Sequence, residues 1–488
     1  MLRKLESKHT KIVATIGPAS EDPEVIRQMI RAGMDVARIN FSHGEHEEHG
    51  RRIATIREVA RQENAVVAIL ADIQGPKIRI GKVANEPRNL RMGELVTFTL
   101  DDVPGEGYVF SLPHPEFMQD IHVGTIILID DGNIQLLVKD TTPRNIVCEV
   151  TVPGDLKSRK GVSAPNAKLT LSAITPKDRA DIQFALSQNV EYMAMSFVRS
   201  ADDILQMRWM MNFFGSEAAI IAKIELQQAL ENIEEIIRVC DGIMVARGDL
   251  GVETPAERVP YEQKRIIKLC NQAAKPVITA TQMLESMREN PRPTRAEASD
   301  VYNAIMDGTD AVMLSAESAS GRYPVEAVKV MANIARTAEE VIFSSRSLAS
   351  QNPFASNLYE GSEGISNAIG AATVAISEAL KPTAIVTTTI SGYTTLRVAK
   401  ERPRTPIVCA TPNEITFHRM ALVWGVVPLL VKEYNTIDEM ISIIIRAAHD
   451  EGLVKRGDTL LLIAGVPFGV KGQTNLIKVH LVGETGEI

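Results

Sequence analysis

The sequence predicts an α/β protein built on a (β/α)8 TIM barrel, with an inserted small β-barrel lid domain and a C-terminal open α/β domain. Eight short apolar runs that alternate with helical patterns predict the barrel. Residues 75–170 separate the third run from the next helix, a gap far too long for a βα loop, and this predicts an inserted domain. A second series of β and α segments from about residue 355 predicts the C-terminal domain.

The eight predicted barrel strands are near-continuous apolar runs, as expected for parallel strands covered on both faces. They are KIVATIG (11–17), VARIN (36–40), VVAILAD (66–72), YMAMSF (192–197), AIIAKIE (219–225), GIMVARG (242–248), PVITAT (276–281) and AVMLSAE (311–317). The first helix, PEVIRQMIRAG, begins on Pro23 and ends before Gly33, two typical helix boundaries. The catalytic barrel domain is therefore predicted to comprise residues 1–74 and 171–345.

The inserted domain, residues 75–170, is predicted to be a small antiparallel barrel that lies over the mouth of the large barrel. Its segments GELVTFTL (93–100), TIILIDDGNIQLLV (125–138) and NIVCEVTV (145–152) alternate apolar and polar residues between turn signals. Its two linkers, at Pro76 and near Asn166, indicate a lid that moves. The C-terminal regulatory domain, residues 355–488, has strand candidates at TAIVTTT (383–389), TPIVCAT (405–411), VVPLLVKEY (426–434), DTLLLIAGVP (458–467) and LIKVHLVG (476–483).

The composition indicates a globular protein that acts on small molecules. The formal net charge of −8 over 488 residues argues against a surface that coats nucleic acid, so anionic ligands must be held by local Lys and Arg. The 4 cysteines are far apart and form no disulfide framework or zinc motif. Without a leader pattern or an apolar span for a membrane, we expect a cytoplasmic location and no membrane partner.

Polar residues end most of the predicted barrel strands, where a TIM barrel places its functional groups. They are Arg38 and Asn40, Asp72, Ser196, Lys223 and Glu225, Arg247 and Asp249, and Thr279 and Thr281. Lys223 and Glu225 lie two residues apart, so both side chains share one face of a strand and can point into the mouth. The alternative is a structural ion pair, which rarely compensates for its desolvation.

Glu225 and Asp249, from neighbouring predicted strands, suit Mg²⁺, which usually takes one or two protein carboxylates and completes its octahedron with water and substrate oxygens. The alternative for Asp249 is a helix cap in a GDLG turn. A lysine beside such a metal can stabilise an enolate or a transferring phosphoryl group. The residues by themselves do not choose between these two chemistries.

Seven motifs together resemble the pyruvate kinase family. They are RINFSHG (38–44), DIQGPKIR (72–79), AKIE (222–225), MVARGDLGVE (244–253), ATQMLESM (280–287), NPRPTRAE (290–297) and DGTDAVMLSAE (307–317). The match is collinear over the barrel and the inserted domain, and the C-terminal domain has the expected length and βα order. The resemblance is to the bacterial type, and the lysine in QGPKIR resembles its potassium-independent branch.

The resemblance implies phosphoryl transfer from phosphoenolpyruvate to ADP, giving pyruvate and ATP in the last step of glycolysis. It implies that Glu225 and Asp249 hold Mg²⁺, with Mn²⁺ as the alternative ion. The implied catalytic residues are Lys223, Thr281, Arg38 and Arg79. The implied substrate-binding residues are Arg38, Lys223, Gly248, Asp249, Thr281 and Ser196. The implied nucleotide-binding residues are Asn40, His43, Arg79 and Lys160. Thr281 is expected to act near the enolate carbon through a hydroxyl and water network.

The family also places a monovalent-cation site at the residues that match Asn40, Ser42, Asp72 and the carbonyl of Ile73, and many members have glutamate where Lys77 stands. The Lys77 ammonium can act as a tethered monovalent cation, so we expect activity that does not require K⁺. The alternative is that Lys77 points to solvent and K⁺ binds.

A phosphorylated small-molecule effector is expected in the C-terminal domain, where family members bind such ligands. The run TTTISGYTT (387–395) provides hydroxyls before a predicted helix. The candidate residues are Thr387, Thr388, Thr389, Ser391 and Thr394. The alternative is ordinary strand-end hydroxyls and an N-cap. A sugar bisphosphate, a sugar monophosphate and AMP all remain candidates, and the family implies a homotetramer.

Two other functions use the same cluster of Lys, Glu and Asp. A metal-dependent pyruvate aldolase or lyase also handles an enolate, but it has no need of a lid that carries Arg79 and Lys160. A non-catalytic regulatory paralogue keeps the ligand pockets without turnover, but the intact Lys223, Glu225, Asp249 and Thr281 argue against it.

Overall fold

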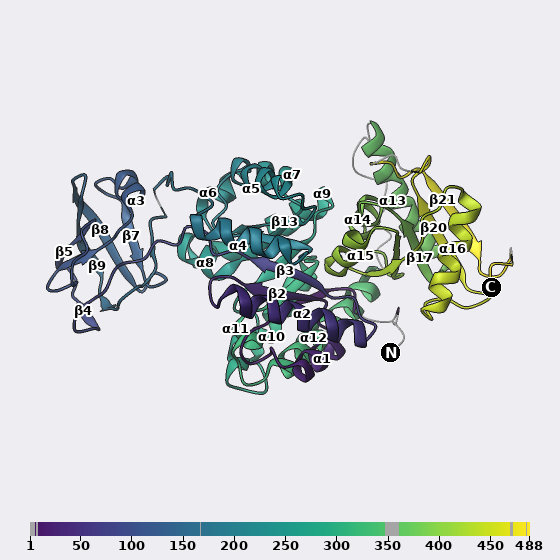
Figure 1. Cartoon of the computed structure of the whole chain (residues 1–488), viewed down its shortest axis with the longest axis horizontal. Helices are drawn as coiled ribbons and strands as arrows, with labels where there is room; N and C mark the ends of the chain where they lie inside the picture. The colour runs from purple at the N-terminus through teal and green to yellow at the C-terminus, as the bar shows by residue number, and fades with distance from the viewer. Residues whose placement is uncertain (1–4, 6–7, 166, 347–360, 469–471, 485) are drawn as a thin grey trace.

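The computed structural model describes residues 5, 8–165, 167–346, 361–468, 472–484 and 486–488. It has three parts along its longest axis: an inserted β domain, a central barrel and a C-terminal α/β domain (Figure 1). The inserted domain stands apart from the barrel on a narrow neck, and the C-terminal domain lies on the opposite side. The predicted linker at Asn166 and most of the predicted junction at 345–355 lie outside the described residues.

The central sheet is a closed barrel of eight parallel strands in the order β1-β16-β15-β14-β13-β12-β3-β2, which confirms the predicted TIM barrel. The strands are β1 (Lys11–Thr15), β2 (Val36–Asn40), β3 (Ala68–Asp72), β12 (Tyr192–Met195), β13 (Ala219–Ile224), β14 (Gly242–Ala246), β15 (Val277–Ala280) and β16 (Ala311–Leu314). Each falls inside a predicted apolar run. The runs are continuous because the strands are buried on both faces.

Helices pack around the outside of the barrel. They are α1 (Pro23–Ala32), α2 (His46–Gln62), α4 (Pro176–Ser187), α5 (Ala201–Phe213), α6 (Gln227–Glu231), α7 (Ile233–Val239), α8 (Arg247–Glu253), α9 (Val259–Ala273), α10 (Arg295–Met306), α11 (Ala316–Ala319) and α12 (Pro324–Arg346), with the 3-10 turns η1 (Ala256–Arg258) and η2 (Glu285–Arg288). Helix α1 begins on Pro23 beside the Asp22 cap and ends before a left-handed Gly33, as predicted.

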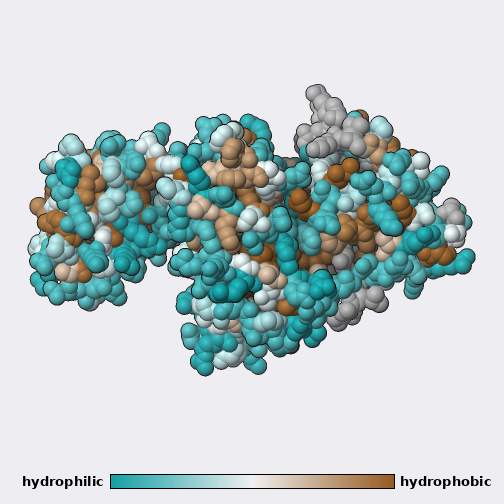
Figure 2. Space-filling model, in the orientation of Figure 1, coloured by the Kyte–Doolittle hydropathy of each residue, from teal (hydrophilic) through white to brown (hydrophobic). Residues whose placement is uncertain are grey.

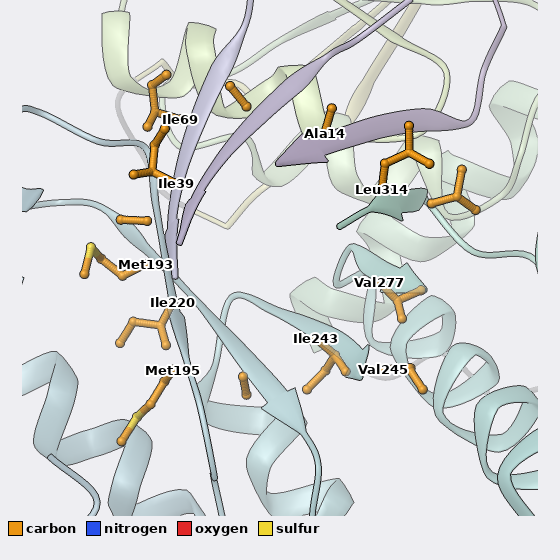
Figure 3. Close-up of a cluster of buried hydrophobic side chains, with 14 of the residues drawn as sticks. Ala14, Ile39, Ile69, Met193, Met195, Ile220, Ile243, Val245, Val277 and Leu314 are labelled. Carbon is orange, nitrogen blue, oxygen red and sulfur yellow. The ribbon is translucent and has the colours of Figure 1, made fainter. Parts of the chain in front are cut away.

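The layer between strands and helices is apolar, and Figure 3 shows labelled members of it, including Ile39, Ile69 and Ile243. A second cluster fills the inside of the barrel, with Val13, Leu70 and Ile221 among its members. The visible surface is mostly hydrophilic (Figure 2), whereas most of the large hydrophobic side chains lie in these two layers and in the cores of the other domains.

The inserted domain consists mainly of antiparallel strands, as predicted, but in the described residues they form two separate sheets and not the closed small barrel that was predicted. Its elements are β4 (Arg88–Leu90), β5 (Leu95–Thr99), β6 (Val109–Ser111), α3 (Pro115–Asp120), β7 (Ile126–Ile129), β8 (Ile134–Thr141), β9 (Asn145–Val152), β10 (Gly154–Leu156) and β11 (Val162–Ser163). They form a six-stranded sheet, β11-β7-β8-β9-β5-β6, and a two-stranded sheet, β10-β4. One pair, β5 and β6, is parallel, because a long connection joins them instead of a hairpin turn.

The C-terminal domain is an open sheet in the order β19-β18-β17-β20-β21, with only β21 antiparallel among these strands. Its elements are α13 (Gly361–Leu380), β17 (Ala384–Thr388), α14 (Tyr393–Ala399), β18 (Ile407–Thr411), α15 (Glu414–Arg419), η3 (Met420–Leu422), β19 (Val426–Leu430), α16 (Ile437–Asp450), β20 (Thr459–Ala464) and β21 (Leu476–Leu481). The order confirms the predicted open α/β fold.

The C-terminal domain covers the amino ends of the barrel strands. Ala421 and Leu422 of η3 pack into the same apolar cluster as the inside of the barrel. The Arg402 guanidinium lies 2.8 Å from Asp310 Oδ1, and Lys11 Nζ donates to the carbonyl of Val426 at 2.8 Å. The functional end of the barrel is therefore the opposite one, toward the inserted domain.

Candidate functional site

The row of side chains inside the barrel changes from apolar to charged at the carboxyl ends of the strands. On β13, Ala219 and Ile221 belong to the apolar interior, and the next residue on that face is Lys223. On β3, Ala68 and Leu70 lead in the same way to Asp72. The two-residue period of a strand therefore brings these charges together at one end of a packed core.

Lys223 lies at the centre of this polar group. Its Nζ donates to Ser196 Oγ at 2.7 Å and lies 2.8 Å from Glu225 Oε1 and 3.3 Å from Asp72 Oδ1. The other Glu225 oxygen accepts the Phe197 N–H at 2.7 Å. The predicted pairing of Lys223 with Glu225 is thus part of a larger network at the barrel mouth.

Burial and charge shift the pKa values in this network in different directions. Burial lowers the pKa of Lys223, but Asp72 and Glu225 outweigh it, and the pKa is raised. Burial raises the pKa of Asp72, but Lys223 and Arg38 outweigh it, and the pKa is lowered. For Glu225, burial and the charge of Asp249 outweigh Lys223, and the pKa is raised. The structure therefore holds a charged lysine beside a carboxyl that favours a proton or another cation.

Arg38, at the end of β2, supplies a second cation to Asp72. Its Nε and Nη2 lie 2.8 Å and 2.7 Å from Asp72 Oδ2, and its Nη1 donates to Thr15 Oγ1 at 2.8 Å. Ser196 Oγ donates to the carbonyl of Ile73 at 2.8 Å. The structure thus brings together Arg38, Asp72, Ile73, Ser196, Lys223 and Glu225 of the predicted residues.

The end of β2 and the loop after it carry three further predicted residues. Asn40 Oδ1 accepts the Ser42 N–H at 3.1 Å, which closes a local turn. His43 is exposed. Asn40 ends the strand that holds Arg38, and Ser42 and His43 follow it, but in the described ranges no hydrogen bond or ion pair joins these side chains to Lys223.

Thr281 and Gly248 meet just beyond the ends of the neighbouring strands β15 and β14. The Gly248 N–H donates to Thr281 Oγ1 at 2.8 Å, and that hydroxyl donates to the carbonyl of Ala280 at 2.6 Å. Thr281 has a φ of 68°, a strained value for a β-branched residue and one that clusters at functional sites. Arg247 holds this loop: it lies 2.7 Å from Asp300 Oδ2 and donates to the carbonyl of Thr281 at 2.9 Å.

Asp249 lies in the first turn of α8, because β14 ends at Ala246. The N-cap of this helix is Ala246, so Asp249 is not the cap residue of the alternative reading. Asp249 lines a cavity together with Glu225. Two carboxylates that face one space fit a divalent oxygen-binding ion, since the single ammonium of Lys223 beside Glu225 compensates only one of the two negative charges. Among the described residues no group of three or more His, Cys, Asp and Glu could hold a metal, so such an ion needs water or substrate oxygens as well.

The cavity lies between the inserted domain and the barrel. Lys77 and Gly161 line it from the inserted domain, and Phe197, Asp249 and Glu253 line it from the barrel. Burial raises the pKa of Glu253 to about 7, a candidate functional group that the sequence interpretation missed. Lys77 thus shares a cavity with the carboxylates, and in the described part of the chain no recorded contact joins it to Asp72.

Arg79 and Lys160 are bound within the inserted domain. Arg79 Nη1 donates to the carbonyl of Arg159 at 2.9 Å, and Lys160 Nζ lies 2.7 Å from Asp130 Oδ1. The structure does not bring these two cations to Lys223, because they belong to a domain that stands apart from the barrel (Figure 1).

A second pocket, of about 420 Å³, lies in the C-terminal domain. Thr388, Thr389, Ser391 and Thr394 line it, whereas Thr387 is buried against the Thr395 hydroxyl at 2.8 Å. The pocket also has wall residues that the sequence interpretation missed: Asn413, Glu433, Tyr434 and Gln473. Side chains from separate loops meet here, and no local sequence pattern connects them.

No helix in the described ranges is both long and apolar enough to cross a membrane. All 4 cysteines are buried and free.

The fold and the site define a (β/α)8-barrel enzyme with an inserted β domain and a C-terminal α/β domain, and similarity to known proteins identifies it as a phosphotransferase. The profile described as "Pyruvate kinase, barrel domain" matches residues 7–328, and "Pyruvate kinase, alpha/beta domain" matches residues 367–480. The chain belongs to the pyruvate kinase family, as the motifs predicted.

Similar proteins include the pyruvate kinases of Geobacillus stearothermophilus, Staphylococcus aureus and Sporosarcina psychrophila. The first is 49% identical over 480 residues, covering 98% of this chain and 81% of the relative. The second and third are 46% identical with the same coverage. These relatives favour a phosphotransferase over the aldolase, lyase and non-catalytic alternatives.

Proposed function

We propose that the chain transfers the phosphoryl group of phosphoenolpyruvate to ADP at the barrel mouth, as a glycolytic enzyme. The observation that carries this proposal is the Lys223 ammonium, which Asp72, Glu225 and Ser196 hold within 3.3 Å at the end of an apolar barrel. Such a preorganised cation stabilises negative charge that develops on a transferring phosphoryl group and an enolate.

The charge of the site supports the same substrates. Arg38 and Lys223 provide two cations, and Asp72, Glu225 and Asp249 provide three carboxylates, which leaves one net negative charge when all are ionised. A divalent ion reverses this to one net positive charge. Phosphoenolpyruvate is an anion, so the site attracts it only when the ion is present.

Glu225 and Asp249 would hold Mg²⁺, or Mn²⁺ as the alternative. Bound there, the ion would supply Lewis-acid stabilisation of the phosphoryl and enolate oxygens. The chain's own groups then have distinct tasks. Arg38 and Lys223 bind the phosphoryl group. The Gly248 N–H and the Ser196 hydroxyl would exchange their present acceptors, Thr281 Oγ1 and the Ile73 carbonyl, for the substrate carboxylate. The Thr281 hydroxyl would then pass a proton through water to the enolate carbon.

The nucleotide is proposed to lie between the barrel and the inserted domain. Asn40 and His43 would contact it from the barrel, and Arg79 and Lys160 from the inserted domain. Their present partners, the Arg159 carbonyl and Asp130, keep both cations on the inserted domain. Approach of this domain, residues 75–170, to the barrel would then complete the site, and compaction in X-ray scattering on addition of Mg²⁺ and both substrates would support it.

Activity is further proposed to be independent of K⁺, with Lys77 in place of the monovalent ion. Lys77 lines the cavity that also contains Glu225 and Asp249, so its charge already lies near the proposed metal ligands. A tethered ammonium adds to the field at the phosphoryl group without an ion from solution.

Pyruvate formation from phosphoenolpyruvate, ADP and Mg²⁺, measured with and without K⁺, tests both proposals. We expect equal rates for the parent and K⁺ dependence for Lys77→Glu. Lys82→Glu, at an exposed position of the same domain, is the matched control and should stay independent of K⁺. A parent that is active only with K⁺ contradicts the role of Lys77 but not the reaction.

The C-terminal domain is proposed to bind a phosphorylated effector in the pocket lined by Thr388, Thr389, Ser391 and Thr394. Glu433 is the charged residue among the described lining residues, so a phosphate there would rely on hydroxyl and backbone donors. The assembly is proposed to be a cytoplasmic homotetramer, which sedimentation equilibrium would test.

A further inference from the structure

The two chain crossings between the barrel and the inserted domain meet at one buried carboxylate. Asp178 Oδ1 accepts the N–H of Gly75, where the chain leaves β3 for the inserted domain, at 3.0 Å. Asp178 Oδ2 accepts the N–H and the hydroxyl of Thr175, where the chain returns to the barrel, at 2.9 Å and 2.6 Å. Asp178 has 0% exposure, so these bonds do not compete with water.

Asp178 is also the N3 residue of the capping box that begins α4. A capping box by itself is local, because its two partners lie at the start of one helix. The bond to Gly75 spans 103 residues and is no part of that motif. This extra bond links helix α4 to Gly75, where the chain leaves the barrel for the inserted domain. The Asp178 carboxylate therefore does more than cap the helix.

Gly75 is packed against residues that position Lys223. It has a φ of +71°, and a Cβ on it would lie 2.9 Å from Phe197 Cδ2 and 3.1 Å from Ser196 Cβ. Ser196 in turn bonds the Ile73 carbonyl at 2.8 Å and accepts from Lys223 Nζ at 2.7 Å. A shift of the crossing therefore displaces the segment that holds the lysine.

We propose that Asp178 is a positioning residue that fixes the pivot of the inserted domain and, through Gly75 and Ser196, the place of Lys223. It touches neither substrate nor metal in this role. The effect on turnover rests on the proposed function, whereas the effect on the crossings is independent of it.

The test compares Asp178→Asn with Glu191→Gln. An asparagine keeps the shape but replaces one acceptor oxygen by a donor, so it cannot serve both crossings. Glu191 is the matched control, because it is a buried carboxylate that accepts the Ile69 N–H at 2.6 Å at the other end of the same strand. Both variants lose a buried acceptor near β3, but only Asp178 touches the crossings.

For Asp178→Asn we expect amide hydrogen exchange in peptides 73–77 and 172–176 to accelerate by about tenfold or more. We expect kcat to fall by about tenfold while KM for phosphoenolpyruvate changes by less than about twofold, since the loss concerns alignment and not ground-state binding. Glu191→Gln should change neither the exchange of these peptides nor kcat.

Unchanged exchange and kcat in Asp178→Asn, or equal effects of both variants, would overturn the proposal. If Asp178→Asn does not fold, Thr175→Val removes one of the three bonds to the carboxylate, together with the N-cap bond from the Asp178 N–H, and leaves the Gly75 bond in place. It should then accelerate exchange in peptide 172–176 more than in peptide 73–77, with a smaller fall in kcat. If the parent forms no pyruvate, the proposed function fails, but faster exchange in Asp178→Asn alone still supports the pivot.

Discussion

Replacement of Lys223 by methionine removes an ammonium but keeps most of the apolar stem, so the variant tests charge and not packing. The Nζ lies 2.8 Å from Glu225 Oε1 and 2.7 Å from Ser196 Oγ, at the centre of the polar group. Loss of one preorganised donor from a site of this kind lowers kcat by about 10²–10³-fold. We expect a fall of that size in pyruvate formation.

The same substitution should act in the opposite direction on the metal. Glu225 Oε2 already accepts the Phe197 N–H, and Oε1 is the oxygen that Lys223 holds. A hydrogen bond to a charged group contributes about 1.5–3 kcal/mol, so releasing Oε1 should tighten Mn²⁺ binding by about ten- to a hundredfold. Lys223 also lowers the pKa of Glu225, and without it protons compete more strongly. The gain should therefore appear at about pH 8 and decrease as the pH falls.

Mn²⁺ titration by electron paramagnetic resonance and steady-state kinetics measure the two effects. Lys11→Met is the matched control, because Lys11 is also a buried lysine of a barrel strand but lies at the end that faces the C-terminal domain. A Lys223→Met enzyme that keeps kcat within about threefold, or that binds Mn²⁺ more weakly at about pH 8, would refute the reasoning.

Two further predictions concern the C-terminal side of the molecule. Burial lowers the pKa of Lys11 to about 8 from 10.5. Between these two pH values the unfolded chain holds a proton on Lys11 that the folded chain has lost. The free energy of unfolding therefore rises with pH across this window, by about 3 kcal/mol. Lys11→Met should remove this slope from the melting temperature; an unchanged slope would contradict it. In calorimetry with fructose 1,6-bisphosphate, glucose 6-phosphate and AMP, Ser391→Ala should weaken the binding of whichever ligand binds the parent, whereas Thr436→Ala, a helix cap outside the pocket, should not. No binding of any of the three to the parent would argue against an effector of these classes.

The barrel was predictable from the sequence because its strands are buried on both faces, which gives each run an unbroken apolar pattern. The two-residue spacing of Lys223 and Glu225 correctly placed both at the mouth, since strand period alone decides that relation. The ends of helices and strands were less predictable. Asp249 was assigned to the end of a barrel strand because it follows an apolar run, but the strand ends at Ala246 and Asp249 lies in the first turn of α8.

Contacts between distant segments were not predictable. The bond from Gly75 to Asp178 and the pair of Arg247 with Asp300 depend on how separate loops meet, and no local periodicity encodes them. The parallel pairing of β5 with β6 was missed because β6 has three residues, too few to show alternation. The location of Lys77 depends on a long flexible stem, which the turn at Gly75 and Pro76 does not fix.

The turn η3 seals the barrel at its amino end, where Leu422 is fully buried among the interior side chains. Substrates and products consequently exchange at the face beneath the inserted domain, and nothing bound to the C-terminal domain can reach the reacting atoms through the barrel. An effect of the proposed effector on the barrel would have to pass through the contacts between the two domains, among them those of Arg402, Lys11 and Tyr192. The proposed catalytic site and the proposed effector pocket are thus physically separated, so the C-terminal pocket can change its ligand preference while the barrel mouth stays as it is.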